Sequence, residues 1–93
     1  MTTHDGELIH SFSARVTDEA GRSWGAVAYG RPAGNVWLGW IAFTDEAGAT
    51  VQTDVETSQP DRAALEYWTT GIVPIYLDGG LARARGSPVQ SRP

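Results

Sequence analysis

The pentapeptide TDEAG occurs twice, at residues 17–21 and 44–48, and each copy lies between two runs rich in apolar residues. Asp suits the first position of a type I turn, and Gly suits the left-handed position that follows it in a common hairpin turn. Both copies therefore predict β-hairpins. The cross-strand pairs expected beside the two turns are Asp18–Arg22, Val16–Trp24 and Phe43–Val51.

These turns, together with a third hairpin loop at residues 31–35, divide the first part of the chain into four predicted strands. The strands span residues 8–17, 23–30, 36–44 and 49–56. The predicted fold class is α+β: a four-stranded antiparallel β-meander with one or two C-terminal helices packed on one face. A chain of 93 residues favours a single domain, which we place at residues 1–85, before a disordered tail at residues 86–93.

The register of the central hairpin decides which side chains share a face, and a slip of one residue would exchange Trp37 for Trp40. We favour the register that makes the two TDEAG turns equivalent, because one face is then almost wholly apolar. That face holds Phe12, Ala14, Val16, Trp24, Ala26, Ala28, Trp37, Ile41, Phe43, Val51 and Val55. The other face holds Ser11, Ser13, Arg15, Val27, Tyr29, Leu38, Trp40, Gln52 and Asp54. Small residues mid-sheet, Gly39 among them, would let a helix approach closely.

A helix is predicted at residues 59–70, with Ser58 as its N-cap and Gly71 as the residue at which it stops. The next segment has two interpretations. Pro74 can open a second helix, with Leu77 and Leu81 on its apolar side, although two adjacent glycines weaken it. The alternative is a fifth strand, IVPIYL, followed by a DGG turn.

The composition excludes several kinds of chemistry. The chain has no Cys, which excludes disulfides, thiolate catalysis and Cys-based zinc sites. His4 and His10 are the only histidines, and no further ligands stand at metal-binding spacing around them. No glycine-rich phosphate loop connects a strand to a helix. The sequence therefore predicts no metal, no cofactor and no catalytic group, and favours a protein that is not an enzyme.

The carboxylates fit structural positions. The Asp–Glu pairs in the two turns are expected to face solvent as ordinary turn residues. Asp54 and Glu56 are the pair that an enzyme would use, but on a flat solvent face they lack the cleft that perturbs a catalytic pKa. The formal charge of −4 disfavours nucleic-acid binding, and no apolar run is long enough to span a membrane. We expect a cytoplasmic protein, and the use of Arg without Lys is typical of GC-rich bacterial genes.

Two aromatic clusters suggest function. Tyr29, Leu38 and Trp40 would form an apolar patch on the sheet face away from the helices, unless another part of the chain covers it. Such a patch predicts a non-enzymatic protein-interaction module that binds itself, as a homodimer, or another protein. The alternative is a small-ligand pocket between sheet and helix. Its lining would be Trp24, Trp37, Trp68 and Tyr76.

Two stretches of sequence carry a resemblance. The stretch VWLGWIAFTDEAGATVQTDVETSQPDRAALEYWTTGI resembles the strand–turn–strand–helix core of HicB-type antitoxins, in which a polar segment leads from the last strand into a helix. The ETxQP…YWxxG…YLxGxLxRA arrangement of the C-terminal half is similar to that of small uncharacterised bacterial proteins. Neither resemblance implies catalytic residues.

Overall fold

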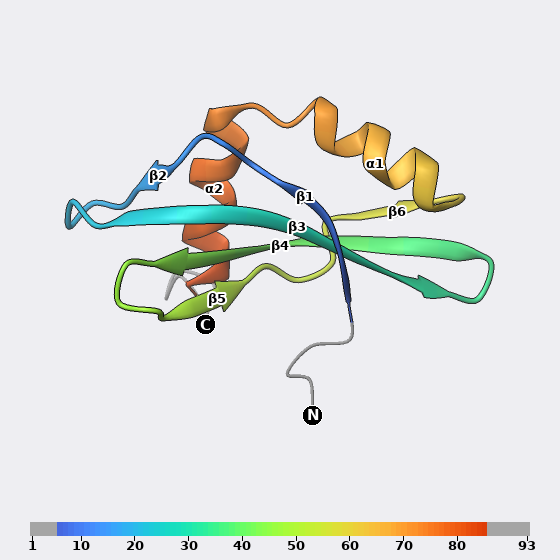
Figure 1. Cartoon of the computed structure of the whole chain (residues 1–93), viewed down its shortest axis with the longest axis horizontal. Helices are drawn as coiled ribbons and strands as arrows, with labels where there is room; N and C mark the ends of the chain where they lie inside the picture. The colour runs from blue at the N-terminus through green and yellow to red at the C-terminus, as the bar shows by residue number, and fades with distance from the viewer. Residues whose placement is uncertain (1–5, 86–93) are drawn as a thin grey trace, which may run out of the picture.

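The computed structural model describes residues 6–85, which form one antiparallel sheet with two helices on one of its faces (Figure 1). The elements are β1 (Glu7–Ser11), β2 (Val16–Thr17), β3 (Ser23–Ala33), β4 (Val36–Asp45), β5 (Thr50–Gln52), β6 (Thr57–Gln59), α1 (Arg62–Thr70) and α2 (Pro74–Ala84). The strand order is β1-β3-β4-β5, with β2 also paired to β3 and β6 also paired to β4. The predicted α+β class is confirmed. The predicted disordered tail at residues 86–93 lies outside the described residues.

The central hairpin is longer than predicted. β3 and β4 pair without interruption from Trp24↔Asp45 to Ala33↔Val36, so the loop is not residues 31–35 but only Gly34 and Asn35. Gly34 has a φ of 64°, the left-handed geometry that tight hairpin turns require. Trp24 and Phe43 lie on the same face, as the favoured register predicted.

Both TDEAG turns form as predicted and have the same geometry. Gly21 and Gly48 are left-handed, with φ of 84° and 95°. In each turn the amide of the Gly donates to the carbonyl of the Asp, at 2.9 and 3.1 Å. The expected pairs Val16↔Trp24 and Phe43↔Val51 are present.

The two outer strands are each divided in two, which the sequence analysis did not predict. The strand expected at residues 8–17 becomes β1 and β2, with a bulge between Leu8 and His10. The strand expected at residues 49–56 becomes β5 and β6. Between them the amide of Ile41 donates to the side-chain oxygen Thr53 Oγ1, at 3.1 Å, and not to a backbone carbonyl of the neighbouring strand.

The first helix starts later than predicted. Asp61, not Ser58, is the N-cap of α1, since the amide of Ala64 donates to Asp61 Oδ1 at 2.8 Å. Ser58 instead lies in β6, opposite Leu38. The helix does stop at Gly71, as predicted.

Glycine at two positions brings the helices close to the sheet. A Cβ at Gly39 would stand 2.6 Å from Leu65 of α1, and one at Gly80 would stand 3.3 Å from Phe43. Both glycines therefore contribute closeness of packing, which explains why α2 tolerates Gly80 in its interior. Residues 74–84 form the helix α2, so the alternative of a fifth strand is wrong. The core beneath the helices consists of Val16, Trp24, Ala26, Ile41, Phe43, Leu77 and Leu81.

Candidate functional site

The helices leave one face of the sheet uncovered, and we call it the outer face. Its central residues come from two strands that pair side by side: Val27, Tyr29 and Arg31 of β3 lie opposite Ala42, Trp40 and Leu38 of β4. Both helices contact the opposite face, where Leu65 meets Gly39 and Phe43 meets Gly80. The predicted patch residues Tyr29, Leu38 and Trp40 are therefore brought together on this face.

Trp40 is the buried residue at the centre of the outer face. Its indole stacks on Tyr29 with ring centroids 6.3 Å apart, and its Nε1–H donates to Gln52 Oε1 at 2.7 Å. The chain at Gly6 also lies against it, since a Cβ on Gly6 would meet the indole ring at 2.6 Å. Trp40 is only 8% exposed. The prediction of an exposed aromatic patch is thus wrong for Trp40, while Tyr29 and Leu38 remain half-buried.

The outer face carries two arginines at opposite ends. Arg31 stands opposite Leu38. The guanidinium of Arg15 lies over Gly25, whose added Cβ would meet Arg15 Nη1 at 3.2 Å, and its Nε–H donates to Ser23 Oγ at 2.7 Å. None of the outer-face residues of β3, β4 and β5 is acidic. This local excess of positive charge contrasts with a chain whose net charge is −4.

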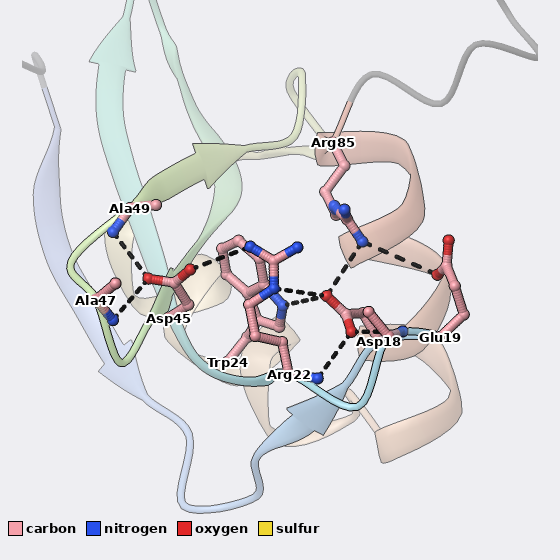
Figure 2. Close-up of polar contacts among 9 residues, drawn as sticks. Asp18, Glu19, Arg22, Trp24, Asp45, Ala47, Ala49 and Arg85 are labelled. Carbon is pink, nitrogen blue, oxygen red and sulfur yellow. Dashed lines mark hydrogen bonds and ion pairs between the residues drawn. The ribbon is translucent and has the colours of Figure 1, made fainter.

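The two TDEAG turns meet at one end of the covered face in a charged cluster whose two Asp side chains are buried (Figure 2). Arg22 bridges them, with Nε 3.4 Å from Asp18 Oδ2 and Nη1 3.5 Å from Asp45 Oδ2. Arg85, the C-cap of α2, reaches Asp18 at 3.2 Å. Arg22 and Arg85 both stack on the indole of Trp24, at 5.5 and 5.8 Å. The cluster ties the first turn to the second turn and to the end of α2.

Asp18 is the centre of this cluster. Its side chain is 1% exposed and that of Asp45 is 3% exposed, so the prediction that these turn carboxylates face solvent is wrong for both Asp residues. The hydrogen bond from Trp24 Nε1–H, at 3.0 Å, is the main cause that lowers the pKa of the Asp18 carboxyl. Burial opposes that shift, whereas the amides of Arg22 and Ala20 and the charge of Arg22 favour it. Asp18 accepts hydrogen bonds from two turn amides and one indole and pairs with two arginines, which indicates a structural role.

A second polar group joins the break between β5 and β6 to α2. The hydroxyl of Tyr76 donates to Glu56 Oε1 at 2.5 Å, and Arg83 Nη2 lies 2.8 Å from the same oxygen. Burial, followed by the hydrogen bond and charge of Glu56, raises the pKa of Tyr76 to about 12. The expectation that Glu56 lies on a solvent face beside Asp54 is therefore wrong, because its side chain faces α2. Asp54 is exposed.

Three residues of the predicted ligand pocket meet in the core, where Trp68 and Tyr76 pack against the cluster that contains Trp24. Trp24 lies at the open end of the central hairpin, opposite Asp45, whereas Trp37 lies near the Gly34–Asn35 turn, opposite Gln59. Trp68 and Tyr76 do touch, edge to face, at 6.4 Å. An open hollow of about 310 Å³ lies along α1. It is lined by Gln59, Ala64, Tyr67, Trp68, Thr70 and Gly71, so Trp68 alone of the four takes part.

Within residues 6–85, no three His, Cys, Asp or Glu side chains are grouped so as to hold a metal ion. His10 is exposed and lies against Phe12, while His4 falls outside the described residues. In the same part of the chain, neither helix combines the length and apolarity needed to cross a membrane.

Comparisons with protein-family models, curated proteins and solved structures yield no significant match to this chain.

Proposed function

We propose that this protein is a non-enzymatic interaction module that binds another protein through its outer face. The observation that carries the proposal is the apolar centre of a sheet face on which neither helix packs, formed by Val27, Tyr29 and Leu38 above Trp40. Hydroxyl and amide side chains such as Thr44, Thr50, Ser23 and Gln52 lie around it on the same face. An apolar centre with a polar rim is typical of protein interfaces.

The sheet edges support binding by the face rather than by strand addition. β1 contains a bulge, and Arg62 of α1 donates to its Leu8 carbonyl at 3.5 Å. The opposite edge consists of β5 and β6, each only three residues long and separated by a break. Bulges, short strands and covered carbonyls are the means by which proteins prevent pairing at sheet edges.

The test is selection from a random peptide library displayed on phage, with the purified protein as bait. Leu38→Arg places a charge in the apolar centre at a half-buried position, so the fold tolerates it. The matched control is Tyr67→Ser, which changes a 79% exposed side chain on α1. We expect wild type and the control to enrich the same peptides, and Leu38→Arg to lose them.

The opposite outcome would refute the proposal: peptides retained by Leu38→Arg and lost by Tyr67→Ser. Light scattering over a concentration series completes the test, because it detects a second copy as the partner. A dimer that dissociates in Leu38→Arg would support the outer face as the interface. A dimer that persists in Leu38→Arg would contradict it.

The hollow along α1 supports a second candidate function, binding of a small apolar ligand. Its volume of about 310 Å³ is at the small end of ligand sites, and Trp68 and Tyr67 supply aromatic surface. The intrinsic tryptophan fluorescence, to which Trp68 contributes, should then respond to a panel of small aromatic metabolites. A response in wild type that Tyr67→Ser removes and Leu38→Arg retains would favour this function over the first.

A further inference from the structure

The arginines of the described residues fall into two groups, those with a carboxylate partner and those without one. Within residues 6–85, four of the six arginines form ion pairs with carboxylates: Arg22, Arg62, Arg83 and Arg85. Arg15 and Arg31 have no carboxylate partner in that part of the chain. The sequence has 11 acidic residues against seven arginines, so unpaired arginines are not the result of a shortage of acids.

Both of these arginines lie on the outer face, one at each end of the apolar centre. Arg15 lies over Gly25 of β3. Arg31 stands six residues after Gly25 on that strand. Six residues of extended chain correspond to about 20 Å. Val27 and Tyr29 project from the same face between the two charges.

We infer that the outer face binds an extended segment of a partner protein that has apolar side chains in its middle and carboxylates at both ends. This inference rests on the proposed function and adds the chemistry of the partner. A segment of about six or seven extended residues matches the length of β3 from Gly25, over which Arg15 lies, to Arg31. Its carboxylates would supply the counter-charges that residues 6–85 do not provide to Arg15 and Arg31.

The same charges argue against two other occupants. A second copy stacked on the outer face would bring four arginines together with no acidic residue from β3, β4 or β5 of either copy. A single-stranded nucleic acid needs a basic groove that follows many phosphates, whereas this face has two cations and the chain is net negative. Light scattering detects the first occupant and an oligothymidine probe the second, and a dimer through this face would overturn the inference about the partner.

Fluorescence anisotropy with three labelled probes tests the inference: the peptide EELFLFEE, the peptide KKLFLFKK and an oligothymidine of about twelve bases. We expect the acidic peptide to bind best and its affinity to fall with added salt. Arg15→Gln and Arg31→Gln should each weaken it about two- to fivefold. Arg83→Gln, which removes an arginine on the helix side, is the control and should leave the affinity unchanged.

Equal affinity for both peptides, or no effect of Arg15→Gln and Arg31→Gln, overturns the inference about charge. If Leu38→Arg still abolishes binding in that case, the proposed function stands. Tighter binding of the oligothymidine makes the partner a nucleic acid, which overturns both. If no probe binds and the phage library yields no peptide dependent on Leu38, the inference and the proposed function both fail.

Discussion

On one face of the sheet, Phe43 and Ile41 are sealed beneath two helices, whereas on the other face Tyr29 and Leu38 keep part of their surface in water. The two faces are built from the same two strands and carry similar apolar side chains. They differ in their glycines and charges. Gly39 of the sheet and Gly80 of α2 admit helices to one face, and two arginines with no carboxylate partner within residues 6–85 flank the other. Apolar content alone therefore does not identify a core, because close approach and charge pairing decide which face is buried within the chain.

The largest difference between the faces is expected from truncation of a single apolar side chain. Phe43→Ala removes a ring that is fully buried between α2 and the sheet, and it should cost about 3–5 kcal/mol of unfolding free energy. Leu38→Ala on the outer face should cost about 1 kcal/mol or less, because that side chain is partly solvated already. Urea unfolding followed by circular dichroism measures both. Similar losses for the two variants would contradict the assignment of the faces.

Two glycines in strands, one on each face, provide a sharper comparison. Gly39→Ala directs a methyl group at Leu65, which is itself fully buried and cannot move away, so we expect a loss of about 1–3 kcal/mol. Gly25→Ala directs its methyl group at the end of the Arg15 side chain, which is exposed. That change should stay within about 0.5 kcal/mol of wild type. Thermal unfolding of the two variants side by side checks the contrast, and equal melting temperatures would argue against α1 on the Gly39 face.

Acid should unfold the protein through its covered side. Because the folded-state pKa of Asp18 lies below the ordinary value of 3.8, its carboxylate stabilises the fold above that pH. The stabilisation is lost as the pH falls through the lowered pKa. We expect Asp18→Asn to lower Tm at neutral pH and to reduce the drop in Tm between neutral and acidic pH. An unchanged pH profile in Asp18→Asn would show that this carboxylate does not link folding to pH.

The smallest effect on stability is expected at the unpaired arginines. Arg31→Gln breaks no ion pair within residues 6–85, so its free energy of unfolding should match that of wild type to within about 0.5 kcal/mol. Arg22→Gln is the comparison, since Arg22 bridges Asp18 and Asp45 on the covered side. Scanning calorimetry should find a lower Tm for Arg22→Gln and a wild-type Tm for Arg31→Gln. A clear loss in Arg31→Gln would mean that Arg31 serves the fold and not a partner.

Local signals in the sequence were sufficient for much of the fold. The paired TDEAG turns determine the hairpins and their register, because Gly21 and Gly48 supply the left-handed residue that the turn needs. Pro74 correctly predicts the start of α2. The face that holds Tyr29, Leu38 and Trp40 was also predicted, since alternation along a strand assigns side chains to faces.

The remaining features depend on contacts between distant parts of the chain. The amide of Ile41 donates to the hydroxyl of Thr53, and this bond interrupts the last predicted strand. No local sequence pattern predicts it. Ser58 is as good a cap as Asp61 by residue type, but pairing with β4 commits it to a strand. The burial of Asp18 required Trp24 and Arg85 to converge from different elements. The repetition of Asp at the same turn position was the one signal that could have indicated it.

The most direct test of the account is to map the binding site of a library-selected peptide by NMR, using backbone amide shifts of the labelled protein. We expect the largest shifts at residues 27–31 and 38–42, on the two central strands of the outer face, with the side-chain signals of Arg15 and Arg31 also perturbed. Shifts concentrated at residues 64–71, around the hollow along α1, would contradict it and would identify that hollow as the binding site.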